Sequence, residues 1–296
     1  MRSVKFFVAA GAASLLSSAA FAADMPSIMP PPPQPYYAPP PVEDFGGWYL
    51  RGDIGFSNQR VGNIRKSDPL AYSQISSLQE TTNFDSGGIF DVGVGYRFNN
   101  WFRTDVTAQY RGNANFKGTD VFNASAFGVA YNGQDNYSAS KSELLFLANA
   151  YVDLGTWWCI TPFVGAGVGT SRVTISGFSD NGVNNLQQPA APAAPFAGGP
   201  PVASSATASS GSQWNFAWAL HAGLAYQISP NVTLELAYSY VDLGPGTTGV
   251  ISDFTGFQAG HTFKFNDITS NDVKLGVRWN FDAPHAYAPP PLVTKG

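Results

Sequence analysis

Short segments in which apolar and polar side chains alternate at every second residue constrain the fold of this chain more than any other feature. In residues 48–56, for example, Trp48 and Leu50 belong to an apolar row, whereas Arg51 and Asp53 belong to the opposite row. Because successive side chains of a β-strand point to opposite faces, such a segment predicts a strand with one apolar and one polar face. Eight segments share the pattern: 48–56, 90–98, 102–111, 143–154, 162–169, 214–228, 232–240 and 272–281.

The connections between these segments differ in length. Short connections lie at 99–100, 155–159 and 229–231, and long ones lie at 57–86, 112–139, 174–212 and 245–269. Short turns at one end and long loops at the other are typical of bacterial outer-membrane barrels, whose tilted strands need about 9–11 residues to cross the hydrocarbon layer. We therefore predict an all-β fold, an eight-stranded antiparallel up-and-down transmembrane β-barrel over residues 47–281, with four long extracellular loops.

Every charged residue within the eight segments falls on the row opposite the apolar one. A lipid-facing Arg or Lys near the bilayer centre costs roughly 2–4 kcal/mol, so these side chains are expected to point into the lumen. Six are basic and seven are acidic, which predicts mutual pairing and a lumen that is closed or leaks only ions. The predicted lumen charge network consists of Arg51, Asp53, Asp91, Arg97, Arg103, Asp105, Arg111, Glu143, Asp153, Glu235, Asp272, Lys274 and Arg278.

Residues 1–22 have the layout of a cleaved secretory signal, with a basic start, an apolar stretch, and the small residues Ala20 and Ala22 at the cleavage site. Cleavage removes two of the 16 basic residues and leaves 14 against 20 acidic ones, which disfavours a nucleic-acid partner. The proline-rich stretches 23–46 and 282–296 are predicted to be a periplasmic linker and a periplasmic tail. They act as plain spacers or, in the alternative interpretation, contact peptidoglycan.

The last predicted strand carries Lys274, Gly276, Trp279 and Phe281. A polar residue, a glycine and two alternating aromatic residues at the end of the final strand predict a recognition signal for the barrel-assembly machinery. The alternative is that Trp279 and Phe281 belong only to an interfacial aromatic girdle.

Few residues indicate catalysis. Cys159 is the single cysteine, so an intramolecular disulfide cannot form, and we expect this side chain to be an apolar filler. His221 is expected to join a hydrogen-bond network in the lumen; the alternative is a catalytic role of the kind found in barrel enzymes that act on outer-membrane lipid. Alternating glycines such as Gly93 and Gly95 are expected to make room for large neighbours. No metal-ligand spacing occurs in the sequence, so we predict no metal site, no cofactor and no enzyme activity.

Five motifs resemble those of one known family: GWYLRGDIGFS at 47–57, GVGYRF at 93–98, PFVGAGVG at 162–169, YSYVDLG at 238–244 and VKLGVRWNF at 273–281. With them the chain resembles the opacity-type surface antigens, which are small porin-like barrels of alphaproteobacterial outer membranes, similar to the eight-stranded OmpA transmembrane domain. The resemblance covers nearly the whole predicted barrel and implies a location in the cell outer membrane. Because the motifs are structural, it implies no catalytic residue.

Two classes of function are compatible with these expectations. In the first, a barrel filled by side chains supports the envelope and displays its loops for interaction with an extracellular ligand. In the second, the protein is a narrow porin-like channel for small solutes or ions; a lipid-modifying enzyme is a distant third. We favour the first, because eight strands enclose a lumen that side chains fill. The expected partners are outer-membrane lipid, lipopolysaccharide and the barrel-assembly machinery.

Overall fold

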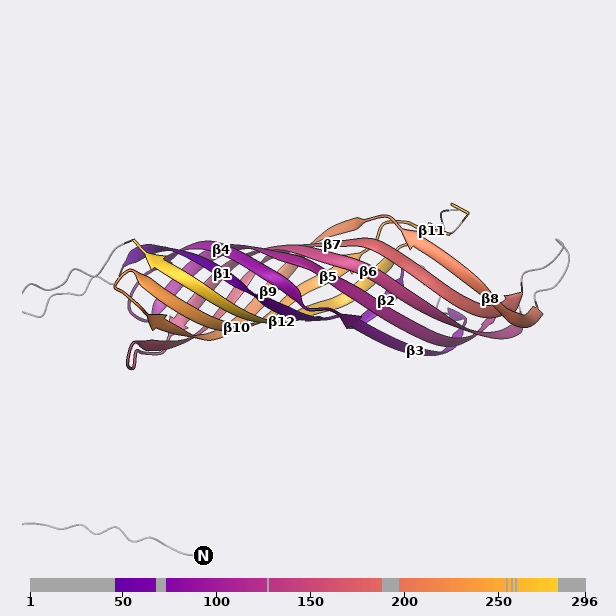
Figure 1. Cartoon of the computed structure of the whole chain (residues 1–296), viewed down its shortest axis with the longest axis horizontal. Coiled ribbons are helices and arrows are strands. Elements are labelled where there is room, and N and C mark those ends of the chain that lie inside the picture. The colour runs from indigo at the N-terminus through magenta and orange to yellow at the C-terminus, as the bar shows by residue number, and fades with distance from the viewer. Residues whose placement is uncertain are drawn as a thin grey trace, which may run out of the picture. The chain divides into compact units, whose positions relative to one another are not determined.

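A computed structural model describes residues 46–67, 73–126, 128–187, 197–253, 255–256, 258 and 260–281 (Figure 1). Its regular elements join a single 12-stranded sheet. The strands are β1 (Gly47–Arg60), β2 (Asn63–Lys66), β3 (Ile75–Phe84), β4 (Gly87–Arg97), β5 (Phe102–Ala126), β6 (Val129–Asp153), β7 (Ile160–Gln187), β8 (Ala197–Ala208), β9 (Gly211–Gln227), β10 (Val232–Thr247), β11 (Ile251–Asp253) and β12 (Phe263–Asn280). Within these described residues, no helix has the length and apolar character needed to cross a membrane.

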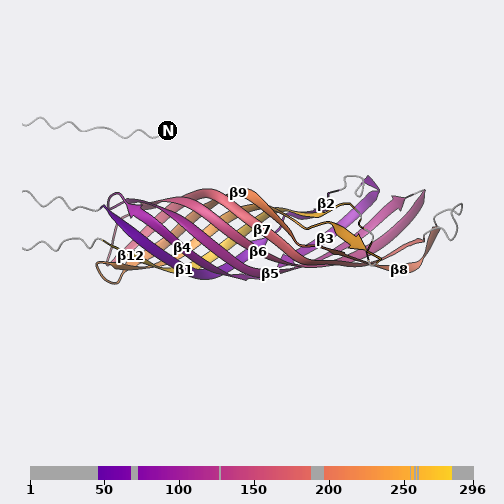
Figure 2. The same cartoon turned by 90° about the horizontal axis from the view of Figure 1, so that it is seen from above.

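Eight of the strands close into a ring. β1 pairs with β4 and with β12, and the pairings continue through β5, β6 and β7 on one side and through β10 and β9 on the other. The pairing of β7 with β9, from Ile160↔Tyr226 to Ile175↔Gly211, completes the ring. All of these pairings are antiparallel, and the strands are tilted around a common axis in both views (Figures 1 and 2). The predicted eight-stranded antiparallel barrel is confirmed.

The two ends of the barrel differ. At the first, which we call the short-turn end, brief connections follow β4, β6 and β9, and the ends of β1 and β12 lie beside each other, with Tyr49 opposite Asn280. At the second, the long-strand end, β5, β6 and β7 continue far beyond their neighbours, with lengths of 25, 25 and 28 residues. Figure 1 shows these strands extending away from the closed ring.

The prediction of four long loops is wrong for most of their length. β2 and β3 lie within 57–86, and β5 and β6 run through 112–139 until they meet at Ala126↔Val129. β7 and β8 occupy much of 174–212, and parts of β10 and β12, together with β11, occupy much of 245–269. Beyond the ring, β3, β5, β6, β7, β8 and β11 form a continuous sheet, which we call the extension.

The outside of the ring is apolar and its inside is charged, the reverse of a water-soluble protein. Phe56 and Phe216 are 73% and 69% exposed, whereas Arg103 and Arg111 are fully buried. We call the exposed outer surface of the ring the apolar belt. It includes Trp48, Leu50, Ile54, Phe56, Phe90, Val92, Val94, Val106, Tyr110, Leu144, Phe146, Val152, Val164, Val168, Trp214, Phe216, Leu220, Leu224, Leu236, Tyr238, Val273, Leu275, Val277 and Trp279.

The turn between β6 and β7 carries the single cysteine. The expectation that Cys159 is an apolar filler is wrong: its side chain is exposed, because the residue lies in a tight turn at the short-turn end. Trp158 and Cys159 both adopt the left-handed conformation, with φ of 49° and 67°. The expectation for the strand glycines is confirmed at Gly95, since a Cβ there would clash with the ring of Tyr49.

Candidate functional sites in the lumen and the extension

Glu235 on β10 is the centre of a buried charge network in the lumen. Its Oε1 lies 2.8 Å from Arg278 Nη1 and 3.5 Å from Arg103 Nη2, and its Oε2 lies 3.6 Å from Arg51 Nη2. Arg51 also pairs with Asp105 at 3.0 Å, so the contacts cross the lumen between several strands. A buried charge is costly unless an opposite charge lies beside it, and these pairs supply that charge, while Glu235 Oε1, Arg103 Nη2 and Arg278 Nη1 make no hydrogen bond of regular geometry.

Tyrosine side chains complete this group. The hydroxyl of Tyr49 donates to Asp105 Oδ2 at 3.1 Å, and the hydroxyl of Tyr151 accepts a hydrogen bond from Arg51 Nη1 at 3.0 Å. The ring of Tyr151 also lies 4.2 Å from the guanidinium carbon of Arg103, within the range of a cation–π contact. The arginines are therefore held by aromatic faces as well as by carboxylates.

A second charged group lies nearer the long-strand end. Arg111 pairs with Asp272, and Lys141 pairs with Glu143. Gln59 Nε2 donates to Glu143 Oε2 at 3.0 Å. A further pair joins Lys274 to Asp91 at 3.3 Å. Every charge in these groups has an opposite charge beside it.

All the charged residues predicted to point into the lumen are buried except Arg97, which is partly exposed. Arg97 Nη2 donates to Asn280 Oδ1 at 3.4 Å, close to the short-turn end. The prediction missed Lys141, which is 1% exposed and lies two residues before the predicted strand that begins at 143. The continuation of the alternating row from Glu143 back to Lys141 is the signal that could have found it. With Lys141, the interior row holds seven basic and seven acidic side chains.

His221 belongs to a hydrogen-bond chain in the lumen wall. Its Nδ1 lies 2.8 Å from Ser239 Oγ, and its Nε2 lies 3.2 Å from Asn149 Oδ1. The Asn149 amide nitrogen donates to Asp105 Oδ1 at 2.8 Å, which leaves its oxygen to accept a hydrogen bond from His221. Ser239 is fully buried, so a substrate cannot reach its hydroxyl, and the chain connects the histidine to the charge network.

An apolar cluster fills the interior beyond the second charged group. We call it the apolar plug, and it consists of Ile64, Phe84, Ala114, Phe116, Tyr137, Ala139, Leu145, Leu147, Val173, Ile175, Phe178, Ala217, Ala219, Val241, Leu243, Ile251, Phe263, Phe265 and Ile268. Its rings pack closely, with centroids 5.1 Å apart for Phe116 and Phe265 and 4.6 Å apart for Phe178 and Phe263. Side chains from opposite walls therefore meet across the interior.

The inner face of the extension carries carboxylates. Asp120 on β5 is opposite Asp135 on β6, and Asp180 on β7 is opposite Tyr137 on β6, whose hydroxyl donates to Asp120 Oδ2 at 3.1 Å. Burial, with added repulsion from Glu80 and Asp135, raises the pKa of Asp120 to about 6, and burial with repulsion from Asp135 raises the pKa of Asp180 to about 7. Among the described residues, no group of three His, Cys, Asp or Glu is placed to hold a metal ion.

The outer face of the extension is different, because amides and hydroxyls dominate it. Facing rows of neighbouring strands give Ser77, Gln79, Thr81, Asn83, Asn115, Lys117, Thr119, Val121, Asn123, Asn132, Gln134, Asn136, Ser138, Ser140, Ser176, Ser179, Asn181, Val183, Ala203, Ser205 and Thr207. We call this surface the amide-hydroxyl face. Among these residues the only charged side chain is that of Lys117, and the carboxylate of Asp85, directly after β3, accepts from Asn115 Nδ2 at 3.4 Å.

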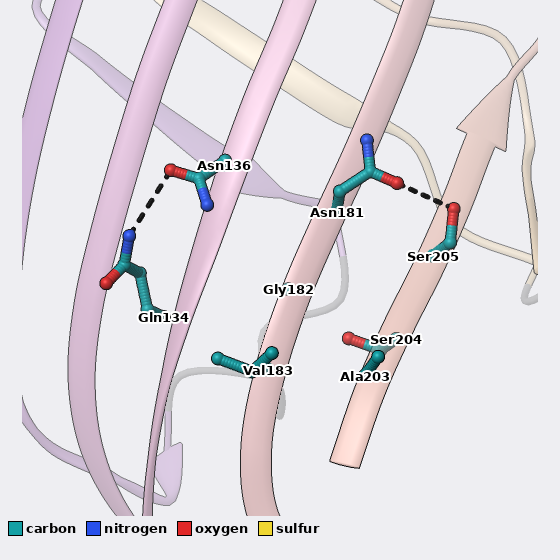
Figure 3. A pocket seen from close by; sticks show the side chains of 8 residues that line it. All are labelled: Gln134, Asn136, Asn181, Gly182, Val183, Ala203, Ser204 and Ser205. Carbon is teal, nitrogen blue, oxygen red and sulfur yellow. Dashed lines mark hydrogen bonds between the residues drawn. The ribbon is translucent and has the colours of Figure 1, made fainter. Parts of the chain in front are cut away.

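A hollow of about 640 Å³ lies on this face over β6, β7 and β8 (Figure 3). Gln134 and Asn136 border it on one side, and Ser205 Oγ donates to Asn181 Oδ1 at 2.8 Å on the other. Gln134 and Val183 also line a second hollow, so the two adjoin. The face thus offers donors and acceptors in a shallow trough.

The proposed assembly signal is split between two faces. Trp279 and Phe281 are 59% and 55% exposed on the outside, near the short-turn end. Lys274 points inward to Asp91, and a Cβ on Gly276 would clash with the carboxylate of Asp53. Two of the four residues of the motif, Lys274 and Gly276, therefore take part in the packing and charge pairing of the lumen. Ala20, Ala22, the remainder of 1–22, residues 23–45 and the tail 282–296 lie outside the described residues.

An apolar belt around a closed antiparallel ring with a charged interior defines an integral outer-membrane β-barrel. Residues 8–281 match the family described as Outer membrane protein beta-barrel domain, and the chain belongs to this family. The protein is accordingly located in the outer membrane.

Two proteins of known sequence and one solved structure are similar to this chain. The chain is 26% identical to the outer membrane protein PagN of Salmonella typhimurium, over 79% of this chain and 90% of that protein. It is 30% identical to a Rickettsia bellii protein named "Putative adhesin", over 70% of this chain and 77% of that protein. The solved structure of the outer membrane protein OprG from Pseudomonas aeruginosa is 13% identical with a TM-score of 0.44, over 81% of this chain and 98% of that one.

Proposed function

We propose that this protein is a closed surface protein of the outer membrane, which stabilises the envelope and holds the extension outside the cell. In this proposal the short-turn end faces the periplasm and the long-strand end faces the environment, the arrangement usual for such barrels. The observation that carries the proposal is the double filling of the interior, first by paired charges and then by the apolar plug.

Both layers oppose conduction. Ions crossing the lumen would have to separate pairs such as Arg278–Glu235 and Arg111–Asp272, whose side chains are at most 4% exposed. They would then have to enter the apolar plug, where Phe116, Phe178 and Phe265 offer no ligand for an ion. The narrow-channel alternative requires both layers to move aside, and the lipid-modifying enzyme requires a reactive group within reach of lipid.

The surface role draws on the relatives. A relative is named as an adhesin, and the motifs at 47–57 and 273–281 resemble those of opacity-type antigens. We therefore infer that the extension meets an extracellular ligand. Trp279 and Phe281 act as the signal for the barrel-assembly machinery, and the proline-rich tails lie in the periplasm, as spacers or in contact with peptidoglycan.

Two measurements test this proposal. In planar bilayers, the refolded protein is expected to show no steady conductance, and large, stable single-channel currents would establish the channel instead. For the orientation, Cys159 is exposed at the short-turn end and should not react with a membrane-impermeant maleimide on intact cells. A cysteine introduced by Ala130→Cys, at the exposed tip of the β5–β6 hairpin, in a Cys159→Ser background, should react. The opposite labelling pattern would reverse the orientation.

A further inference from the structure

The inner and outer faces of the extension differ in the charged side chains that they carry, although contact with water does not require such a difference. Beyond the ring, both faces of a sheet can meet water, so carboxylates could occupy either. Yet Glu80, Asp120, Asp135 and Asp180 all lie on the inner face, as their partners in the strand register show. On the outer face, the described residues of β3, β5, β6, β7 and β8 named above include no carboxylate, and Lys117 supplies a positive charge; the carboxylate of Asp85, which follows β3, accepts from Asn115 Nδ2 at 3.4 Å.

The amide-hydroxyl face is also continuous with the apolar belt. On β6, Leu144 and Phe146 of the belt are followed in the same outward row by Ser142, Ser140, Ser138 and Asn136. On β7, Val168 is followed in that row by Thr170 and then by Arg172, whose Cα partners are Leu144 and Trp214 of the belt. Along the same outward row of side chains, the lipid-facing apolar belt is therefore followed by a surface of amides and hydroxyls, and Arg172 lies at the boundary between the two.

The height of this face places it beyond the lipid headgroups. The segment of β6 beyond the belt, Val129–Ser142, has about 14 residues, which at ~3.3 Å per residue and a tilt of roughly 45° rises about 30 Å. The headgroup region on one side of a bilayer is only about 5–8 Å thick. Most of the face is thus at the level where, in an outer membrane, the sugar chains of lipopolysaccharide surround a protein.

We propose that the amide-hydroxyl face binds the saccharide part of the lipopolysaccharide of its own membrane. This inference rests on the proposed orientation of the barrel. The side chains offer what sugar hydroxyls require, because each amide is both donor and acceptor and each hydroxyl can be either. The trough beside Gln134, Asn136 and Asn181 provides the place of closest contact, and no carboxylate of the described residues lines it, so it does not repel the phosphate groups that such saccharides carry.

The test uses the full-length protein refolded in lipopolysaccharide-free nanodiscs. The probe is polysaccharide released by mild acid from the lipopolysaccharide of the source cells, with dextran of equal mass as the comparison. The triple variant Gln134→Ala/Asn136→Ala/Asn181→Ala is expected to bind the polysaccharide at least about tenfold more weakly, since a few hydrogen bonds are lost. The matched variant Asn58→Ala/Gln227→Ala, which removes exposed amides from β1 and β9, should stay within about twofold of the wild type.

A smaller change guards against misfolding of the triple variant. Asn136→Asp keeps the oxygen that accepts from Thr119 Oγ1 at 3.1 Å, but it removes a donor and adds a negative charge. It too is expected to weaken binding. If both variants bind the polysaccharide as the wild type does, or if dextran binds as strongly as the polysaccharide, the inference is overturned. It is also overturned if the amide-hydroxyl face mediates contact between two copies of the protein while the variants leave polysaccharide binding unchanged. A labelled Ala130→Cys with no saccharide binding would overturn this inference alone, whereas failed labelling of Ala130→Cys, outside the trough, would overturn the orientation as well.

Discussion

Replacement of Glu235 by glutamine is expected to destabilise the barrel more than any other single neutralisation in the lumen. Glu235 is the shared partner of Arg51, Arg103 and Arg278, and all four side chains are at most 4% exposed. Glutamine keeps the size and one acceptor oxygen but removes the charge, so three buried guanidinium groups lose a common counter-charge. Breaking a buried ion pair in this way costs about 3–5 kcal/mol.

The control is the same substitution in a pair that water reaches. Glu80 accepts from Arg65 Nη1 at 2.8 Å, but the Arg65 side chain is 40% exposed, so solvent screens the interaction. Glu80 Oε1 also accepts from Ile64 N at 2.8 Å, and glutamine can retain that bond. Glu80→Gln should therefore cost at most about 1 kcal/mol.

Urea unfolding of the refolded proteins in lipid vesicles measures both free energies. The double variant Glu235→Gln/Arg278→Gln removes one charge of each sign, and it should be more stable than the sum of the single effects predicts, by roughly 0.5–3 kcal/mol. If Glu235→Gln costs no more than Glu80→Gln, the charges in the lumen are hydrated rather than mutually paired, and the account of a closed interior fails.

Three further outcomes are expected. The hydrogen-exchange protection factors of the extension, which compare each exchange rate with the intrinsic rate at the same pH, should rise as the pH falls from 8 to 5. Burial raises the pKa of Asp180 to about 7, so the folded state binds protons that the unfolded state has released, and this stabilisation is lost as the pH rises through 7. Asp180→Asn should reduce the effect and leave the part due to Asp120, whose pKa burial raises to about 6, whereas Asp85→Asn at an exposed position should leave the effect unchanged. Phe265→Ala, in the fully buried centre of the apolar plug, should cost about 3–5 kcal/mol in urea unfolding yet leave the bilayer free of conductance, because the charge network still fills the lumen. Trp279→Ala together with Phe281→Ala should reduce the amount of assembled protein in the outer membrane far more than it reduces stability in vitro, and normal assembly would leave these residues as girdle aromatics.

The ring could be predicted from sequence because lipid imposes a strict rule on it. In a strand that faces lipid on one side and a packed lumen on the other, apolar and polar side chains must alternate. Exposed Leu50 and Ile54 are therefore direct sequence neighbours of buried Arg51 and Asp53. The same rule assigns each charge to the interior. It does not specify which charges meet, since Arg51 and Glu235 are brought together only by the order and stagger of strands around the ring.

The extension could not be predicted in this way, because beyond the lipid a strand does not need to alternate apolar and polar side chains. On β6, Asn132, Gln134 and Asn136 alternate with Gly133 and Asp135, so both rows lack the apolar residues by which a strand is recognised. On β8, Pro200 and Pro201 argue against a strand, yet they fall within a register irregularity against β7, between Val202 and Gly198. Long-range pairing with β7 determines the structure here.

The apolar plug explains how so long a sheet remains attached to the ring. A sheet that leaves the membrane with polar residues on both faces has little apolar surface of its own to bury, and isolated strands of this kind are marginal in water. Phe84 on β3, Phe116 on β5 and Phe178 on β7 instead pack against Phe263 and Phe265 on β12, which belongs to the opposite wall. The root of the extension is therefore fixed by the same contacts that close the lumen. A ligand held on the amide-hydroxyl face would consequently act on a surface anchored to the barrel.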